Sequence, residues 1–414
     1  MSDPVSFFRD VAAEHRRCFW LDGGGARDWS GRRSIIGWLD DDDVSLSFDA
    51  GRREVTEHRG GHSEVVGADV FDVLDARLCA GEQWFGYFGY AARPDLPARP
   101  DPSLPDAVWM RPREVRVFEH ERGSFQRPPV PARSDSLSEG PPTPYAAAFA
   151  RVQEHLHAGN SYEVNLTYRL VLEADPDPLA AYLRLRHLNP APYAGFLQHD
   201  VADARAWLLS SSPERYALIT PDRHLETKPI KGTTPRGATT VEDEALRERL
   251  ALDPKTRAEN LMIVDLLRND LATVCEVGSV EVPALMQVES YESVHQLVST
   301  VRGHLRPDVS TIAALRALFP AGSMTGAPKL RTMQVIEEVE ATARGAYAGA
   351  FGWISGDGPA DLGVVIRSLM TDGSGTWTLG TGGGITVKSD VAEEWEESRW
   401  KAERLLQALG AQDT

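Results

Sequence analysis

The sequence predicts an α+β fold, and three observations support this class. Short runs that alternate apolar and polar residues, as strands do, fill about the first 90 residues. Helical spacing of apolar residues comes later, and it does not alternate with strands as regular βαβ units. The phosphate-binding motifs GxGxxG and GxxxxGK[ST] are absent from the sequence. The chain therefore favours α+β over a doubly wound nucleotide-binding sheet.

The N-terminal part of the chain is predicted to be rich in strands. Arg33–Leu39 and Val44–Phe48 alternate as strands do, and turns rich in Gly and Asp separate them. A proline-rich stretch over residues 127–145 has the composition of an exposed loop or linker. We therefore divide the chain into an N-terminal β-rich region, residues 1–140, and a second region, residues 141–414.

The second region mixes helical and strand patterns. Its expected elements are a helix over Ala147–Ala158, a strand over Tyr162–Leu172, a hairpin of Trp207–Thr220 with His224–Ile230, and a helical region over Glu242–Leu271.

Two helices carry recognisable start signals. Asp253 and Pro254 interrupt the helical region, because Asp caps a helix and Pro favours the first helical position. The last helix begins near Asp390, with Glu393 three positions on as a capping-box partner. Between these helix starts, one apolar face is expected from Leu261, Val264, Leu267 and Leu271.

Composition and charge narrow the class of protein. The chain has 414 residues, 42% of them hydrophobic, so it can bury a sizeable core. A net charge of -17 repels phosphate groups, which argues against nucleic acid and anionic membranes as partners. Because no run of about 18 apolar residues and no signal-peptide pattern is present, a cytoplasmic protein is expected. The spacing of Cys18, Cys79 and Cys275 suits neither disulfides nor zinc, so these are expected to be ordinary buried thiols.

The C-terminal helix carries charged residues on one stripe. Glu394, Glu397 and Lys401 follow at i, i+3 and i+7. This stripe is more typical of a solvated face with a Glu-to-Lys salt bridge, and its alternative function is a pair of carboxylates for a hard divalent cation. Glu259, at the start of a largely apolar helix, is a candidate third ligand.

Three further charged residues stand in unusual surroundings. Lys231 follows an apolar run and leads into a glycine-containing loop, where a lysine is either solvated or, if its pKa is depressed, a nucleophile. Glu214 is either a partner of Arg or backbone groups, or a general acid that burial would have to keep protonated. Arg367 lies in the apolar run Leu362–Met370, where a guanidinium needs a carboxylate from the protein or from a substrate.

Two segments of small residues read in either of two ways. Gly380–Gly384 lies between two expected strands, and residues 320–328 precede a helix that starts near Lys329. Each segment is either a tight turn or a set of backbone N–H groups offered to an anion.

In their order, these segments closely resemble the chorismate-binding family, which includes anthranilate synthase component I, aminodeoxychorismate synthase component I, isochorismate synthase and salicylate synthase. The matching segments are SSPERY (211–216), KPIKGTTPRG (228–237), AENLMIVDLLRNDL (258–271), VHQLVSTVRG (294–303), PAGSMTGAPK (320–329), RGAYAGAFGW (344–353), VIRSLM (365–370), and GGGITVKSD followed by EEWEESRWKAE (382–403).

The resemblance implies a fold and a set of site residues. It implies one large α+β unit, like that of anthranilate synthase component I, with two antiparallel sheets packed as a β-sandwich and helices outside. Both regions of the chain would belong to this unit. In the implied site, three carboxylates hold Mg²⁺, which binds the ring carboxylate of chorismate: Glu259, Glu394 and Glu397. The implied residues on the enolpyruvyl carboxylate side are Tyr347, Arg367 and Ser323, and those that complete the anion cradle are Gly232, Thr233, Gly382, Gly384 and Lys401.

Lys231 and Glu163 discriminate among the family members. Anthranilate synthases usually carry Ala where this chain has Lys231, and the water-using members carry Lys where it has Glu163. The resemblance thus implies amination of chorismate at C4 to 4-amino-4-deoxychorismate, with anthranilate synthase component I as the alternative. In the implied mechanism, Lys231 adds at C2 while Glu214 protonates the leaving C4 hydroxyl, and ammonia then replaces Lys231. Arg367 and Lys401, together with Mg²⁺, are expected to keep Lys231 neutral by charge repulsion.

Two positions depart from the family pattern, and a glutaminase motif is not evident. Gln296 stands where the family usually has His, and His295 lies one residue earlier. Aminating members more often have Gln where this chain has Glu163. The sequence has no evident Cys-His-Glu glutaminase arrangement, so the ammonia is expected to come from a separate glutamine amidotransferase subunit.

Overall fold

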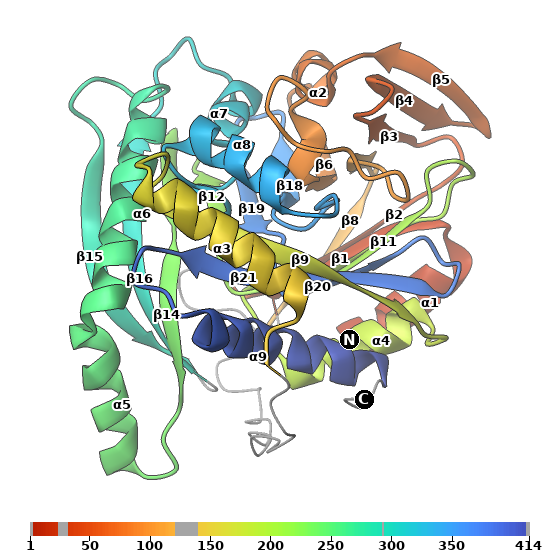
Figure 1. The fold of residues 1–414 in the computed structure, drawn as a ribbon. Helices are drawn as coiled ribbons and strands as arrows, with labels where there is room; N and C mark the ends of the chain where they lie inside the picture. The colour runs from red at the N-terminus through yellow and green to blue at the C-terminus, as the bar shows by residue number, and fades with distance from the viewer. Residues whose placement is uncertain (1–2, 24–31, 121–139, 292–293, 411–414) are drawn as a thin grey trace.

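The computed structural model describes residues 3–23, 32–120, 140–291 and 294–410, and its strands form two large sheets. Neighbouring strands run antiparallel in both sheets. With helices on the outer faces (Figure 1), this confirms the predicted α+β class and the pair of antiparallel sheets.

The nine-stranded sheet, called sheet A, has the order β17-β9-β21-β20-β11-β10-β1-β2-β8. In that order its strands are Gly326–Ala327, Glu163–Glu173, Thr376–Ile385, Ser368–Thr371, Ala206–Ser212, Tyr193–His199, Arg17–Asp22, Arg33–Leu39 and Val115–Glu119.

The twelve-stranded sheet, called sheet B, has the order β14-β16-β13-β12-β19-β18-β6-β7-β3-β4-β5, and β15 also pairs with β16. In that order its strands are Ile230–Pro235, Val294–His304, His224–Lys228, Arg215–Ile219, Ala360–Val364, Ala350–Ser355, Gln83–Phe88, Ala107–Arg111, Val44–Asp49, Glu54–Arg59 and His62–Gly67, with β15 at Glu281–Ser290.

Apolar side chains from the two sheets pack against each other. Phe19 on β1 stacks on Phe85 of β6, with ring centroids 4.1 Å apart. Leu197 and Leu208 of sheet A join Phe351 of sheet B in the same buried cluster. Burial of such large side chains from both sheets stabilises the predicted sandwich.

Helices cover the outer faces of this sandwich. They are α1 (Pro4–Glu14), α2 (Val70–Arg77), α3 (Thr143–His157), α4 (Pro178–Leu188), α5 (Thr240–Leu252), α6 (Pro254–Ala272), α7 (Thr311–Leu318), α8 (Lys329–Val339) and α9 (Val391–Leu409). Helices α1, α4 and α9 pack on sheet A, at the bottom of Figure 1, while α2, α6 and α7 pack on sheet B. The predicted caps are present, because the Asp253 side chain accepts from the N–H of Thr256, and Asp390 caps α9.

Strands from residues 1–140 belong to both sheets. Strands β1, β2 and β8 complete sheet A, and β3 to β7 form one side of sheet B. The N-terminal part is thus β-rich, as predicted. The division at residue 140 stays a prediction, and most of the proline-rich stretch 127–145 lies outside the described residues.

Two burial predictions were wrong in part. Leu261 is 53% exposed, whereas Val264, Leu267 and Leu271 are buried. Each i+3 step falls short of a full turn, so two such steps carry Leu261 about 120° away from Leu267 around the helix. Cys79 is an exposed free thiol, while Cys18 and Cys275 are buried as expected.

The predicted hairpin strand Trp207–Thr220 is in fact two strands in different sheets. Strand β11 ends at Ser212 in sheet A, and β12 begins at Arg215 in sheet B. Only β12 and β13 form the expected hairpin. Alternation along the sequence cannot reveal this crossing, because both strands are buried. The segment between them, Pro213 and Glu214, lies where the two sheets meet.

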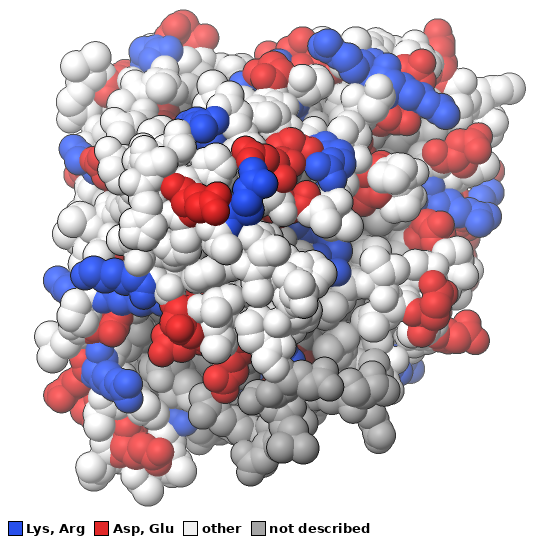
Figure 2. Space-filling view, in the orientation of Figure 1, with Lys and Arg blue, Asp and Glu red and all other residues white. Residues whose placement is uncertain are grey.

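Charged side chains of both signs lie on the face of the molecule seen in Figure 2. On the face seen in Figure 2, basic and acidic side chains are interspersed, and no large basic patch is visible there. None of the described helices combines the length and the apolar character that a membrane span requires.

Candidate active site

One cavity of about 330 Å³ brings together every site residue that the sequence singled out. It lies between strands of both sheets and the helices α6 and α9. The predicted residues that line it are Glu214, Lys231, Gly232, Thr233, Glu259, Ser323, Tyr347, Arg367, Gly382, Gly384, Glu394, Glu397 and Lys401.

Two segments that cross between the sheets place a carboxylic acid and a guanidinium at this cavity. Glu214 lies between β11 and β12, and Arg367 lies between β19 and β20, rather than inside a strand as predicted. The crossings are hydrogen-bonded to each other: Val364 N–H donates to Glu214 O at 3.0 Å, and Ser211 N–H donates to Arg367 O at 3.1 Å. The two side chains are therefore fixed relative to one another by backbone.

Glu214 has the properties of a carboxylic acid that keeps its proton near neutral pH. Its side chain is buried, and burial raises the pKa to about 7. The Ser323 hydroxyl donates to Glu214 Oε1 at 2.6 Å, which opposes that rise. A pKa near 7 suits a general acid in a neutral solution.

Arg367 presents a guanidinium without a carboxylate partner. Within the described residues no hydrogen bond or ion pair engages this side chain, which lies over the Trp400 ring at 5.4 Å from its centroid. Burial lowers its pKa to about 10. Its backbone φ of 50° is in the left-handed region, which costs a non-glycine residue about 1–3 kcal/mol. The fold thus holds an unpaired cation at the cavity wall, where an anionic substrate group can pair with it.

Lys231 lies at a bulge in β14 rather than at a strand end. The register between β14 and β16 shifts between Ile230 and Thr233, and Gly232 has a φ of 81°. A β-bulge re-aims a side chain, and here Lys231 faces the cavity. A side chain at position 232 would meet Thr256 Cγ2 at 2.3 Å, so glycine is required there.

Lys231 is paired with a carboxylate, and its expected neutrality stays a prediction for the enzyme with Mg²⁺ bound. Its ammonium donates to the carboxylate of Glu163. Burial favours the neutral amine, but the charges of Glu163 and Glu259 outweigh burial and raise the pKa of Lys231. Repulsion by Arg367 and Lys401 was the expected influence, but the carboxylates closest to Lys231 dominate.

Gly380–Gly384 is a piece of continuous strand, so the reading as a tight turn was wrong. Strand β21 pairs with β9 throughout, from Gly380 opposite Arg169 to Gly384 opposite Asn165. Added Cβ atoms would lie 2.2 Å from Tyr347 Cγ at position 380 and 2.2 Å from Glu163 Oε1 at position 384. Glycines occur here because neighbouring side chains occupy the space.

The three predicted metal ligands line the cavity, and two of them form ion pairs with lysines. Lys255 Nζ lies 2.8 Å from Glu394 Oε1, and Lys401 Nζ lies 2.8 Å from Glu397 Oε1, which is the salt bridge that the sequence also allowed. Glu259 Oε1 is buried with no hydrogen-bond partner, and burial raises the pKa of Glu259 to about 7.

The donor atoms suit magnesium, although they are not gathered. Among the described residues no three His, Cys, Asp or Glu side chains are close enough together to hold a metal ion. Carboxylate oxygens are nevertheless the ligands that Mg²⁺ prefers, and the bare oxygen of Glu259 needs a cation or a proton. In donor chemistry the residues fit the ion.

Comparison with known proteins settles the family. The sequence model for chorismate binding enzymes matches residues 16–407. The chain belongs to this family. The solved structure of anthranilate synthase component I from Streptococcus pneumoniae TIGR4 superposes with a TM-score of 0.74 at 26% identity, covering 90% of this chain and 92% of that one. The predicted fold is thereby confirmed.

Two curated relatives of this chorismate binding enzyme are aminodeoxychorismate synthases. The one from Streptomyces pristinaespiralis is 37% identical over 98% of this chain and 64% of its own length. "Aminodeoxychorismate synthase component 1" from Escherichia coli (strain K12) is 42% identical over 64% of this chain and 57% of its own length. The chain thus spans less than two thirds of the length of either relative.

The two departures from the family pattern have clear structural places. Gln296, on β16, lines the cavity, while His295 points elsewhere: its ring contacts Asp243 at 3.1 Å and Ser290 at 2.8 Å. Adjacent strand residues face opposite ways, so His295 does not line the cavity.

Sequence reasoning missed Lys255 as a site residue and missed the pairing of Glu163. Lys255 lines the cavity four residues before Glu259, and this spacing on α6 could have indicated a shared helix face. No comparable signal existed for the contact of Glu163 with Lys231, because the two residues are 68 positions apart.

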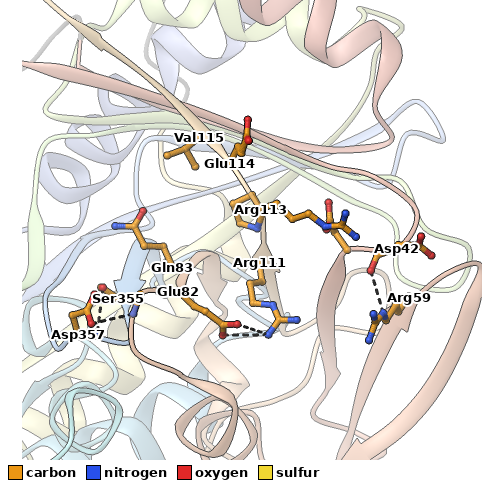
Figure 3. Close-up of a pocket in the computed structure, with 13 residues that line it drawn as sticks. Asp42, Arg59, Glu82, Gln83, Arg111, Arg113, Glu114, Val115, Ser355 and Asp357 are labelled. Atoms are coloured by element: carbon orange, nitrogen blue, oxygen red, sulfur yellow. Dashed lines mark hydrogen bonds and ion pairs between the residues drawn. The ribbon is translucent and has the colours of Figure 1, made fainter.

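A second hollow of about 440 Å³ contains none of the predicted site residues. Figure 3 shows Arg111 joined to Glu82, and Arg59 joined to Asp42. Arg111 pairs with Glu82 at 3.0 Å, Arg113 pairs with Asp43 at 2.6 Å, and Arg59 donates to the Asp42 carbonyl. Because these three arginines are already engaged, the hollow offers little to an anionic ligand, and the chemistry is assigned to the first cavity.

Proposed function

We propose that this enzyme aminates chorismate at C4 and gives 4-amino-4-deoxychorismate. The observation that carries the proposal is the cavity itself, where a largely buried lysine, a buried acid with a raised pKa and an arginine without a carboxylate partner meet. The names of the two curated relatives support the same reaction.

Chorismate is a dianion, and the cavity has groups for both carboxylates. Arg367 takes the enolpyruvyl carboxylate, with Tyr347 and Ser323 beside it, because its guanidinium lacks another partner. The backbone and side chains that complete the anion cradle are those of Gly232, Thr233, Gly382, Gly384 and Lys401.

Magnesium would be held by Glu259, Glu394 and Glu397. When bound, the ion would neutralise the ring carboxylate of chorismate. Glu394 is 4% exposed, and Glu259 has a buried oxygen without a partner, so both would gain from a cation.

The reaction needs a nucleophile and an acid on the same ring. Lys231 adds at C2 while Glu214 gives its proton to the departing C4 hydroxyl, which leaves as water. Ammonia then adds at C4, the ring double bonds shift back, and Lys231 leaves. Removing either a general acid or the covalent nucleophile typically costs at least about 100-fold in rate.

Ammonia would come from a separate glutamine amidotransferase subunit in the cytoplasm. The printed name of the Escherichia coli relative, with its "component 1", supports a partner component.

One assay tests the proposed reaction. The protein is incubated with chorismate, Mg²⁺ and an ammonium salt, and the product is identified by mass and fluorescence. Aminodeoxychorismate without pyruvate is expected. Anthranilate with pyruvate would refute the proposal in favour of anthranilate synthase, and absence of turnover would point to a non-catalytic chorismate-binding protein.

A variant pair tests the role of Lys231. Lys231→Ala is expected to lower the single-turnover rate of aminodeoxychorismate formation by at least about 100-fold. Lys388→Ala removes an exposed lysine outside the cavity and serves as the matched control, with an unchanged rate. A Lys231→Ala enzyme as fast as the control would rule out the covalent role.

A further inference from the structure

Glu163 holds Lys231 from behind the cavity wall. Its side chain has no exposed surface, and it is absent from the cavity lining that includes Lys231. One carboxylate oxygen, Oε1, accepts from the Lys231 ammonium, and the other, Oε2, has no hydrogen-bond partner. Chorismate in the cavity would therefore touch Lys231 but not Glu163.

The fold is built around this pair. Glu163 begins β9 in sheet A, and Lys231 lies at the bulge of β14 in sheet B, so the pair bridges the two sheets. Gly384 leaves the necessary space, since a Cβ there would lie 2.2 Å from Glu163 Oε1 and 3.0 Å from Lys231 Nζ. Three separate segments thus shape the contact.

The proposed reaction requires Lys231 to lose a proton before it attacks. In the described residues, Glu163 is the carboxylate in ion-pair contact with Nζ. The other acids that act on Lys231 lie on different elements: Glu214 at the sheet crossing, Glu259 on α6 and Glu397 on α9. The basic groups of the cavity are Lys255, Arg367 and Lys401.

Burial makes proton transfer within the pair feasible. A buried ion pair loses the hydration of both charges, whereas the neutral amine and carboxylic acid lose far less. Moving the proton from Nζ to Oε1 creates no net charge and needs no water. Bound chorismate would close the cavity side of Lys231 and exclude water from the pair.

We propose that Glu163 is the proton acceptor that converts Lys231 to its nucleophilic amine; this inference rests on the proposed amination. The Nζ–H bond breaks and an Oε1–H bond forms. The freed electron pair of Nζ bonds to C2, and the C4–O bond breaks as Glu214 supplies a proton to the leaving water. When ammonia has displaced Lys231, the proton on Glu163 returns to Nζ.

Glu163→Gln tests the proposal because glutamine keeps the shape but cannot accept a proton. Single-turnover formation of aminodeoxychorismate is measured with saturating ammonium, Mg²⁺ and chorismate. The pH is varied from roughly 6 to 9, so that it covers both sides of neutrality. A loss of about 100-fold near neutral pH is expected, since general base catalysis typically contributes at least that much. The shape of the pH–rate profile should also change, because solvent must then take the proton from Lys231, while loss of the Glu214 proton still slows the reaction above about pH 7. Chorismate affinity should stay unchanged, because Glu163 does not line the cavity.

Two other variants separate a chemical role from a structural one. Glu173→Gln makes the same change at the exposed end of the same strand and should leave the rate unchanged. Glu163→Asp keeps a carboxylate with a shorter reach, so a partial rate and a pH profile shaped like that of the unmodified enzyme are expected. This variant also answers the question if Glu163→Gln does not fold.

The outcomes are distinguishable from failure of the proposed function. A Glu163→Gln enzyme with the unmodified rate and pH profile would overturn the inference. Parallel losses of rate and chorismate affinity at every pH would also overturn it, by showing a structural role. If the unmodified enzyme and Glu173→Gln both release anthranilate and pyruvate, the proposed function is refuted, and the inference that rests on it is refuted as well.

Discussion

Gly384→Ala is the most direct test of the geometry around Lys231. The new methyl group would lie 2.2 Å from Glu163 Oε1 and 3.0 Å from Lys231 Nζ. Since carbon and oxygen need more than 3 Å, the carboxylate must move by about 1 Å and carry its lysine partner with it. Such a displacement at a reacting atom costs about 100-fold in rate, and overpacking costs about 1–3 kcal/mol of stability.

The assay is single-turnover formation of aminodeoxychorismate, followed with chemical unfolding of the same preparation. Gly140→Ala is the matched control, because an added Cβ there meets nothing within 4 Å. The control should keep both the rate and the stability. If Gly384→Ala retains the rate of the control, the Lys231–Glu163 contact does not position the nucleophile and the reasoning is wrong.

Three further predictions follow from single contacts. Arg367→Gln should weaken chorismate binding by about 10- to 100-fold in calorimetric titration, as expected for lost charge-assisted hydrogen bonds. Unfolding should show little loss of stability, because the guanidinium contacts the Trp400 ring but makes no hydrogen bond or ion pair among the described residues. A larger effect on stability than on binding would contradict this reasoning. Ser323→Ala should raise the pKa of Glu214 above about 7, because the hydrogen bond from Ser323 lowers that pKa. The acid then keeps its proton to higher pH, so the alkaline limb of the pH–rate profile should move to higher pH. A limb that does not move would exclude Glu214 as the acid. Leu267→Ala should lower the free energy of unfolding by about 2–5 kcal/mol. Leu261→Ala, at the exposed position, should change it by less than about 0.5 kcal/mol. Equal losses of stability would show that the burial of α6 is wrongly described.

Sequence patterns predicted the elements whose signals are local. The caps at Asp253 and Asp390 and the alternation of Arg33–Leu39 depend on neighbouring residues, and the structure has them as expected. The site residues came from ordered segments that resemble one family. All of them line one cavity, although their roles stay proposals.

The failures concern long-range geometry. In the run Trp207–Thr220, Pro213 interrupts the strand pattern, but alternation along the sequence does not show that the strands on either side of it join different sheets. The glycines of Gly380–Gly384 resemble a turn until the side chains of Tyr347 and Glu163 occupy the space beside them. The charge state of Lys231 depends on Glu163, which only the folded chain brings near.

The paired crossings between the sheets have a mechanical consequence. Backbone hydrogen bonds join the crossing that carries Glu214 to the one that carries Arg367. A small rotation of sheet A against sheet B would therefore move both side chains together, without changing the distance between them. Lys231 and Glu163, in contrast, come from opposite sheets and would be pulled apart by the same rotation. Substitutions between the two sheets, such as those at Phe351, should thus lower the rate of the chemical step while leaving the affinity for the substrate largely unchanged.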